Sequence, residues 1–511
     1  MLEYFADGFV NLLTWQNMLY MLLGLIVGIA FGAIPGLNSM IAITLCLPIT
    51  FALNVYSSFI LLIALYIGAT SGGLISAILI NVPGTTASIA TTFDGHPMAM
   101  NGQAQKALGT AIVFSCIGTI LGIIVLVFFA PQLSSVALRF SPYDYFAVLL
   151  FSISLITILT GDDMLKGLIS GFIGIFVAMI GVTPLDSFPR FTFGSRTLVT
   201  GFPLIPAIVG SFVMSEIIKG CQNNDKVTIK KYQSTGRGFG FSIKEGLSQT
   251  KNCIVSALLG IGIGILPGIG SGTSNLVAYA VEKRTSKHPE KFGTGIIDGI
   301  VAPETANNAT IGGAMLPLLT LGIPGDGSTS LLLGAFIIQG LSPGPALFSS
   351  NPHLMYTIFA AMVVAAIGMV VVQYAGLRGF IKLLKVPYYI LMPIILVLCA
   401  VGAYSANNNI FSIWTLFIMG MLGFLMGKVG IPRAPLVLGI VLGTMLERQL
   451  RSALQLSRNA IGPFLRSPVC LIFLIITAAL LIFTFVSQAK KQSKKRAEEK
   501  AKADIRGSVD Y

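Results

Sequence analysis

The sequence predicts an all-α polytopic integral membrane protein, built from two inverted repeats whose helices are broken or re-entrant at Pro-Gly pairs. Of its 511 residues, 54% are hydrophobic and 10% are charged, whereas soluble domains carry about 25% charged residues. Apolar runs reach helix length, unlike the alternating strands of about 10 residues that form a transmembrane β-barrel. Gly and Pro are abundant, at 56 and 24 residues, as in closely packed and broken membrane helices.

Apolar spans recur along the chain, and at about 20 residues per crossing they predict roughly 10–14 membrane segments, some of them re-entrant. A polar loop is expected at 91–107. In chain order, the spans are expected near 15–34, 38–53, 57–82, 108–130, 144–160, 164–183, 203–220, 252–281, 293–323, 329–349, 354–376, 387–403, 410–427, 433–447 and 468–487.

Charge divides the chain further. The predicted parts are a first transmembrane repeat (1–220), a basic linker (221–251), a second transmembrane repeat (252–467), a final helix (468–487) and a basic tail (488–511). Because Lys and Arg accumulate on the cytoplasmic side of membrane proteins, the linker and the tail are expected in the cytoplasm. The N-terminal segment has neither residue before the first span, so it is expected outside.

Composition excludes several functions. The six cysteines are scattered without a C-x-x-C pair, so neither a disulfide framework nor a zinc site is indicated. The sequence contains no Walker A motif, so the chain is not a P-loop ATPase. Its net charge of +13 comes without a basic–aromatic platform, so no nucleic-acid partner is expected. An intramembrane enzyme would need a nucleophile and a base on facing helices, and no convincing pair exists, so the chain is predicted not to be an enzyme.

Two motifs recur in the same order, which indicates an internal repeat. GIAFGAIPGLNS (28–39) and GIGIGILPGIGS (260–271) share six of twelve positions, 232 residues apart. A second pair lies about 240 residues apart. It aligns Ala69, Thr70, Gly72 and Gly73 with Ala309, Thr310, Gly312 and Gly313, and Pro83-Gly84 with Pro324-Gly325 after a one-residue insertion.

Each repeat therefore supplies two Pro-Gly breaks followed by Ser, Thr or Asn. Inverted repeats of transporters form the substrate site at their interface, from broken helices whose ends bind anions. For each residue alone, helix capping is the commoner role. The predicted substrate-binding residues are Gly36, Asn38, Ser39, Thr85, Thr86, Ser88, Ser271, Thr273, Asn275, Gly327, Ser328 and Thr329.

The stretch 301–330 combines Pro, Gly and small polar residues within an apolar protein. Broken backbone is expected there, because unpaired backbone groups are tolerated at membrane depth only inside protein or beside water. Intramembrane carboxylates indicate function, and neutral oxygens suit a hard cation. The predicted cation-coupling residues are Glu304, Asn307, Asn308, Thr310 and Asp326. The residues leave Na⁺ and H⁺ both open, and no cofactor or metal beyond Na⁺ is expected.

Four blocks of the sequence are distinctive: GAIPGLNS (32–39), NVPGTTASIATTFDGHPMAMNGQAQKALG (81–109), GILPGIGSGTSN (264–275) and FGTGIIDGIVAPETANNATIGGAMLPLLTLGIPGDGSTSLLLGAFIIQGLSPGP (292–345). Together they resemble the large membrane subunit (TctA-type) of the tripartite tricarboxylate transporter family. His96 stands where that family more often has Tyr.

The resemblance implies a protein of the bacterial inner membrane that imports organic carboxylates such as citrate and is driven by an ion gradient without ATP. It also implies a periplasmic solute-binding protein and a small membrane subunit of about four spanning helices. The alternatives are a carboxylate channel, which would not accumulate substrate, and a membrane scaffold that does not transport.

Overall fold

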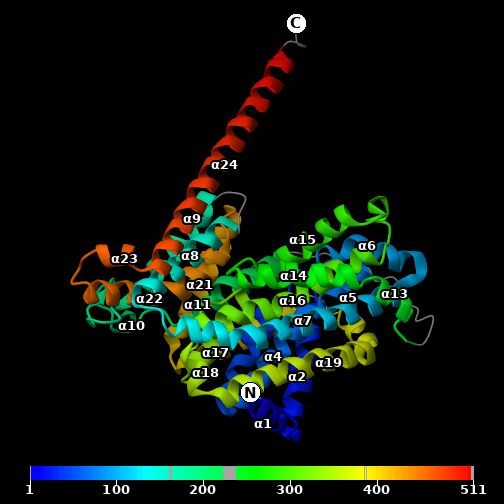
Figure 1. Cartoon of the computed structure of the whole chain (residues 1–511), viewed down its shortest axis with the longest axis horizontal. Helices are drawn as coiled ribbons and strands as arrows, with labels where there is room; N and C mark the ends of the chain where they lie inside the picture. The colour runs from blue at the N-terminus through cyan, green and yellow to red at the C-terminus, as the bar shows by residue number, and fades with distance from the viewer. Residues whose placement is uncertain (1, 160–163, 223–237, 385, 387, 508–511) are drawn as a thin grey trace. The chain divides into compact units, whose positions relative to one another are not determined.

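The computed structural model describes residues 2–159, 164–222, 238–384, 386 and 388–507 (Figure 1). Nearly all elements in these ranges are helices, and the strands found there are β1 (Gly181–Val182) and β2 (Pro189–Arg190), which pair antiparallel. This architecture confirms the predicted all-α class. Residues 223–237 of the predicted linker lie outside the described residues.

Internal contacts divide the chain into two units, one formed by Met1–Arg139 and Arg196–Leu425 and the other by Phe140–Ser195 and Met426–Tyr511. The helices from the first part of unit 1 are α1 (Leu2–Leu12), α2 (Trp15–Ala33), α3 (Ser39–Cys46), η1 (Leu47–Ala52), α4 (Val55–Gly72), α5 (Leu74–Ile80), η2 (Thr86–Ser88), α6 (Thr91–Met98), η3 (Ala99–Gln103) and α7 (Ala104–Ala137).

The second part of unit 1 begins at Arg196 and continues through α21, whose last residues belong to unit 2. Its helices are α10 (Arg196–Val199), α11 (Leu204–Val209), η4 (Gly210–Met214), α12 (Ser215–Gln222), α13 (Ile243–Ser248), α14 (Thr250–Ile265), α15 (Gly270–Thr285), η5 (Pro289–Lys291), α16 (Asp298–Leu321), α17 (Gly327–Ile338), α18 (Ala346–Ser350), α19 (Pro352–Leu383), α20 (Tyr388–Asn407) and α21 (Ile410–Lys428).

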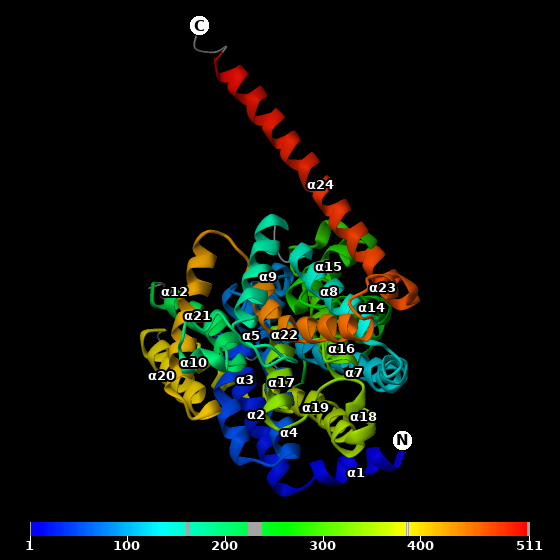
Figure 2. The same ribbon diagram turned by 90° about the vertical axis from the view of Figure 1, so that its left-hand side faces the viewer.

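Unit 2 contains the hairpin β1–β2 and the helices α8 (Pro142–Leu159), α9 (Met164–Ala178), α22 (Arg433–Leu456), α23 (Gly462–Arg466) and α24 (Pro468–Gly507). Figure 2 shows α24 as one long helix. The guanidinium of Arg190 donates to both carboxylate oxygens of Glu447, at 2.7 and 2.8 Å. This bidentate pair attaches the hairpin to α22.

Polar residues begin several of the apolar helices. The side chains of Thr14, Asn38 and Asn54 each accept a hydrogen bond from the backbone N–H three residues later, at the starts of α2, α3 and α4. Such caps satisfy N–H groups that have no partner inside the helix. The short side chains of these residues therefore set where each apolar run becomes helical.

Six helical segments in the described ranges are long and apolar enough to cross a membrane, as expected for a multi-pass membrane protein. Shorter apolar helices, of 10–17 residues, accompany them. The six segments are Trp15–Ala33, Val55–Ile80, Thr91–Ala137, Pro352–Leu383, Ile410–Lys428 and Pro468–Gln488.

Two predictions of irregular backbone were wrong. The stretch 91–107 is helical rather than a loop, with a kink at Gly102, whose φ is +81°. The polar opening of the 301–330 stretch also lies within one helix, α16, and the chain leaves helical conformation only at 322–326. Residues 299–320 of α16 are all buried inside the protein, so the lipid constraint that disfavours polar helices does not apply to them.

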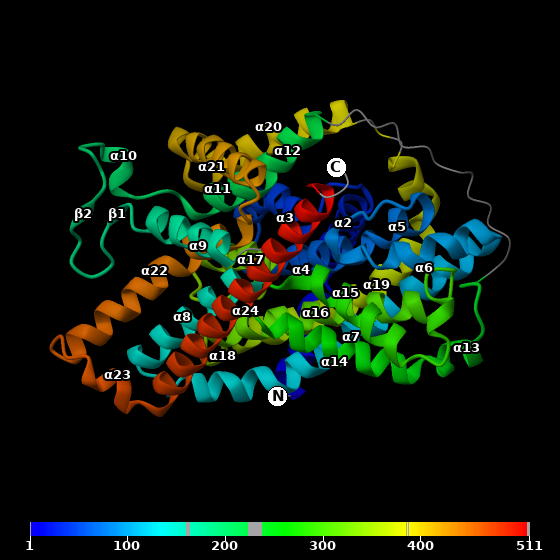
Figure 3. The same cartoon turned by 90° about the horizontal axis from the view of Figure 1, so that it is seen from above.

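Helix α16 lies between α7 and α14 in the core of unit 1 (Figures 1 and 3). Glycines on both neighbours lie directly against its carbonyl oxygens, so that a Cβ at any of them would overlap the backbone. Small residues of this kind let membrane helices approach closely. The contacts pair Gly118 with Thr305, Gly122 with Ala309, Gly260 with Ala306 and Gly264 with Thr310.

Equivalent contacts in the first repeat correct the predicted alignment. Gly28 and Gly32 of α2 lie against the carbonyls of Leu65 and Ala69 in α4. Their counterparts Gly260 and Gly264 lie against Ala306 and Thr310. The two α4 residues therefore correspond to residues 241 positions later, not 240. Matching glycine with glycine displaced the predicted alignment by one residue, and the Pro-Gly pairs need no insertion.

The close contact of α14 with α16 makes a prediction about stability. Gly260→Ala should lower the free energy of unfolding by about 1–3 kcal/mol, as overpacked cores do, because its Cβ would meet the carbonyl of Ala306. Gly262→Ala is the matched control, since no atom lies within 4 Å of a Cβ there. Thermal unfolding of both purified variants checks this. Equal losses of stability in the two variants would show that the contact with Ala306 does not determine the cost.

A second prediction concerns pH and the exposed helix α13. The Nζ of Lys106 donates to Oε1 of Glu245 at 2.6 Å. This hydrogen bond, and then one from the backbone N–H of Ser242, lower the pKa of Glu245 from 4.5 to about 2. Because the folded pKa is the lower one, the contact stabilises fully above pH 4.5 and loses its effect as pH falls toward 2.

Hydrogen exchange of residues 238–249 tests this contact. Glu245→Gln should speed their exchange relative to the unmodified chain at pH 7, and the difference should shrink as the pH falls toward 2, where about half of the Glu245 carboxylates are protonated. Glu290→Gln is the control, because its carboxylate is 66% exposed and pairs with His288 outside this segment. Equal exchange of the Glu245→Gln and unmodified chains at pH 7 would contradict the prediction.

Candidate functional site

The four Pro-Gly breaks lie in unit 1, and within each repeat the two breaks pack together. Gly84 lies against the carbonyl oxygen of Gly32, and a Cβ on Gly325 would lie 2.8 Å from that of Gly264. In the second repeat the backbone N–H of Gly268 also donates to the carbonyl of Gly325 at 2.7 Å. Each break is therefore packed against protein, the setting in which irregular backbone is tolerated at membrane depth.

The breaks also pack across the repeats. The hydroxyls of Ser39 and Ser328 are 2.6 Å apart, which joins the first break of one repeat to the second break of the other. Met40 lies against Gly327, and a Cβ on Gly272 would lie 3.2 Å from the side chain of Thr86. Met40 corresponds to Gly272 and Thr86 to Gly327 in the repeat alignment. The contacts are therefore reciprocal, as a pseudo-twofold relation requires.

The other predicted substrate residues fall into three groups. Some hold local structure: Asn38 caps α3, Asn275 accepts from Ala90 N–H and donates to Pro303, Ser88 binds the backbone of Thr85, and Thr329 binds Asp326. Others are exposed or partly exposed beside a break: Gly36, Thr86, Ser271, Thr273 and Gly327. Ser39 and Ser328 meet across the repeats, and the hydroxyl of Thr85 is buried without a hydrogen-bond partner among the described residues.

Asp326 is the N-cap of α17. Its Oδ1 accepts from the backbone N–H of Thr329 at 2.7 Å, and its Oδ2 accepts from the hydroxyl of Tyr66 at 2.7 Å. Tyr66 belongs to α4 in the other repeat and is buried. The sequence reasoning missed this tyrosine because it stands inside an apolar run; only alignment at 241 positions marks it, by pairing it with Asn307.

Glu304 lies inside α16 with no exposed surface. Its two oxygens accept from the hydroxyls of Thr91, at 2.5 Å, and Ser115, at 2.8 Å. These donors come from α6 and α7, neither of which the motif analysis singled out for this role. A buried carboxylate held by neutral hydroxyls alone keeps a strong tendency to bind a proton or a cation.

The other three predicted cation-coupling residues of α16 follow Glu304 along the helix. The hydroxyl of Thr310 lies 2.7 Å from that of Ser274 and donates to the carbonyl of Ala306 at 2.8 Å. The amide nitrogen of Asn308 donates to the Glu304 carbonyl at 3.0 Å, while its amide oxygen has no partner within the described ranges. Both amide atoms of Asn307 lack partners among the described residues, although only 1% of the residue is exposed.

A further buried carboxylate, Asp94 of α6, was also missed. Its Oδ1 accepts from the backbone N–H groups of Gly293, Gly295 and Ile296, at 2.9–3.0 Å, and its Oδ2 from Tyr279 at 2.8 Å. Three backbone donors satisfy a carboxylate fully, so Asp94 holds the turn that leads into α16. The sequence did contain a signal for this role, because Asp94 is the one Asp or Glu in the block 81–109.

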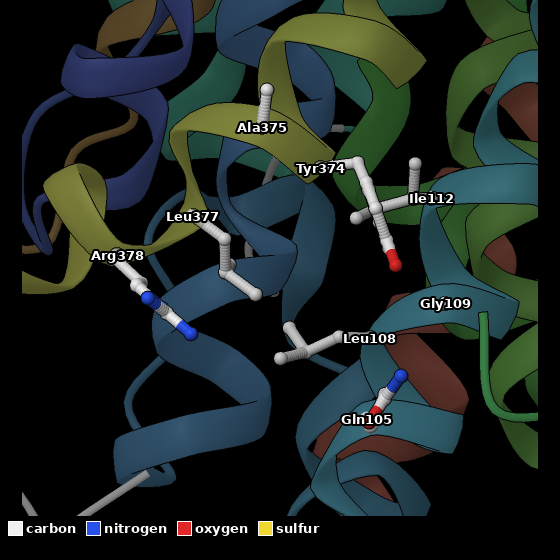
Figure 4. A pocket seen from close by; sticks show the side chains of 8 residues that line it. All are labelled: Gln105, Leu108, Gly109, Ile112, Tyr374, Ala375, Leu377 and Arg378. Carbon is white, nitrogen blue, oxygen red and sulfur yellow. The ribbon is translucent and has the colours of Figure 1, made fainter. Parts of the chain in front are cut away.

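The structure also contains a pocket of about 260 Å³ between α7 and α19. It mixes apolar side chains with the polar ends of Gln105, Tyr374 and Arg378 (Figure 4). No predicted site residue lines it. Within the described ranges, no group of three or more His, Cys, Asp or Glu could hold a metal ion. The oxygens of Glu304 and Asn308 remain the best candidates for a hard cation.

The chain is similar to known proteins over most of its length. The sequence model of the tripartite tricarboxylate transporter TctA family matches residues 18–438. An uncharacterised 52.8 kDa protein of the TAR-I ttuC′ 3′ region of Agrobacterium vitis is 35% identical over 490 residues, which cover 96% of this chain and 97% of that protein. An uncharacterised protein of the TAR-II ttuC′ 3′ region of the same organism is 41% identical over 207 residues, 40% of this chain and 86% of that protein.

The family match spans both repeats, all four breaks and α16. Its members are components of a tripartite transport system, which has other subunits. The chain therefore belongs to the tripartite tricarboxylate transporter TctA family, a family of transporter components and not of enzymes.

Proposed function

We propose that this chain is the large membrane subunit of a secondary active importer of di- and tricarboxylates such as citrate, coupled to Na⁺ or H⁺. The observation that carries the proposal is the reciprocal meeting of four Pro-Gly breaks lined by hydroxyls and amides. The stretches 30–46, 69–92, 260–281 and 298–345 contain no Lys or Arg. A carboxylate there would be held by neutral donors, which release an anion more readily than a buried salt bridge does.

Coupling to a cation follows from the buried carboxylates. An anion entering this site brings negative charge next to Glu304 and Asp326, which costs free energy at low dielectric. A proton or Na⁺ bound with the substrate would offset that charge. Glu304 is the stronger candidate, because two neutral hydroxyls are its hydrogen-bond donors, whereas Asp326 already caps α17.

The proposed location is the bacterial inner membrane. The C-terminus lies in the cytoplasm, because the segment after the apolar part of α24 is rich in Lys and Arg and such segments stay inside. The N-terminus lies in the periplasm, because the segment before the first span has neither residue. A periplasmic solute-binding protein would deliver the carboxylate, and a small membrane subunit would complete the complex. The tripartite nature of the family supports both partners.

Uptake of radiolabelled citrate into proteoliposomes tests the function. The vesicles hold this chain with its small subunit and binding protein, and a Na⁺ gradient or a proton gradient is imposed separately. Accumulation above the outside concentration with one gradient alone identifies the coupling ion. Equilibration without accumulation would favour a carboxylate channel, and no uptake of citrate or of a panel of other carboxylates would favour a scaffold.

Glu304→Gln tests coupling in the same vesicles. The substitution keeps the size of the side chain and an acceptor for one hydroxyl but removes the ionisable group. Gradient-driven accumulation should fall at least about tenfold, the loss expected when an interaction with a charged group of about 1.4 kcal/mol or more is removed. Thermal unfolding of the variant should change little by comparison.

Asp298→Asn is the matched control on the same helix. Asp298 starts α16 and pairs with Gln249 and Ser286 at its partly buried end. The asparagine variant should accumulate citrate within about threefold of the unmodified chain, within the scatter of surface substitutions. Full accumulation by Glu304→Gln would remove Glu304 from the coupling site.

A further inference from the structure

The two repeats differ at one pair of equivalent positions. Alignment at 241 positions places Tyr66 opposite Asn307 and Thr85 opposite Asp326. The same alignment relates Leu65 to Ala306, which make equivalent contacts with glycines of α2 and α14. A contact between Tyr66 and Asp326 therefore predicts a facing arrangement of Asn307 and Thr85 in the other half.

In the first pair, Tyr66 and Asp326 contact each other directly. The hydroxyl of Tyr66 donates to Oδ2 of Asp326 at 2.7 Å, and the backbone N–H of Thr329 donates to Oδ1 at 2.7 Å. The carboxylate thus has a side-chain donor from one repeat and a backbone donor from the other. The Tyr66–Asp326 pair therefore shows that the fold can accommodate a carboxylate at this position.

The second pair has the same backbone but different side chains. The hydroxyl of Ser88 accepts from Thr85 N–H at 3.4 Å and donates to the Thr85 carbonyl at 3.0 Å. Thr329 makes the corresponding contacts with Asp326, at 2.8 and 2.9 Å. Here, however, the cap is a threonine without a carboxylate, and the shorter Asn307 replaces the tyrosine.

These differences leave buried polar atoms unpaired. Neither amide atom of Asn307 nor the hydroxyl oxygen of Thr85 has a hydrogen-bond partner among the described residues, and 1% of Asn307 is exposed. Leaving a buried donor without a partner costs free energy, because the group has lost its hydrogen bonds to water. One such atom would be a local defect, but unpaired atoms at both members of an equivalent pair indicate that a ligand completes the contact.

The helical phase of α16 directs Asn307 toward this position. Thr310 faces α15, where it meets Ser274, and Glu304 faces α6, where it meets Thr91. At 3.6 residues per turn, Asn307 lies about 60° from each of these directions. The sector between α15 and α6 contains η2, which packs against both α15 and α16.

We propose that a carboxylate of the transported anion binds between Asn307 and Thr85, in the place equivalent to the carboxylate of Asp326. The assignment rests on the proposed transport of carboxylates. It makes Asn307 a substrate ligand rather than a cation ligand, with its Nδ2 and the Thr85 hydroxyl as donors. It also means that only one of the two equivalent positions binds substrate, since the carboxylate of Asp326 already occupies the other and contacts Tyr66 there.

Asn307→Asp tests the assignment. It keeps the size and shape of the side chain, but it replaces the amide donor with a carboxylate, so the position would favour a cation over an anion. The measurement is calorimetric titration of the full chain in detergent with citrate, succinate and Na⁺, with thermal unfolding to verify folding. If the position binds a carboxylate, the dissociation constant for citrate rises at least about tenfold, because a donor is replaced by a like charge. Thr85→Val, which removes the other donor, should weaken citrate binding in the same direction.

Tyr66→Phe is the matched control at the equivalent position. It removes the hydrogen bond to Asp326, so it should lower the unfolding temperature while leaving the citrate dissociation constant within about threefold. Unchanged citrate binding by Asn307→Asp, or tighter Na⁺ binding with citrate unaffected, would overturn this inference and leave the proposed function intact. If the unmodified chain binds neither carboxylate, the proposed function fails and this assignment with it.

Discussion

The close approach of glycines in α7 and α14 to the carbonyl oxygens of α16 is the contact on which the rest of unit 1 depends. It surrounds α16 with protein, so residues 299–320 are buried and none has to face lipid. A helix enclosed in this way can carry Glu304, Asn307 and Asn308, which hydrocarbon would not tolerate. Backbone packing by residues without side chains therefore creates the polar interior in which a transport site can exist.

Three carboxylates are buried in the part of unit 1 that the structure describes, and they differ in their hydrogen-bond donors. Asp94 receives three backbone N–H groups and holds a turn. Asp326 receives one backbone N–H and one tyrosine hydroxyl, and it caps a helix. Glu304 receives two hydroxyls and no backbone donor. A backbone N–H group can only donate to a carboxylate, whereas a hydroxyl can donate or accept.

The sequence was sufficient for the membrane class and for the positions of the Pro-Gly breaks, because composition and breaker residues are local signals. It was insufficient for α6 and for Asp94, whose polar residues look like a loop until their partners are known. It also misaligned the second motif by one residue. Glycine matched glycine in the sequence, but the register is set by which carbonyl each glycine of the neighbouring helix meets, and that is a property of two helices together.

The reciprocal contacts between breaks have a consequence for each repeat taken alone. The first break of each repeat is completed by the second break of the other, as Ser39 is by Ser328 and Gly272 by Thr86. One repeat alone therefore contains two incomplete halves and no whole site. A chain with a single repeat would need a second copy to make these contacts. In one chain that holds both repeats, equivalent positions can carry different residues, as Tyr66 and Asn307 do.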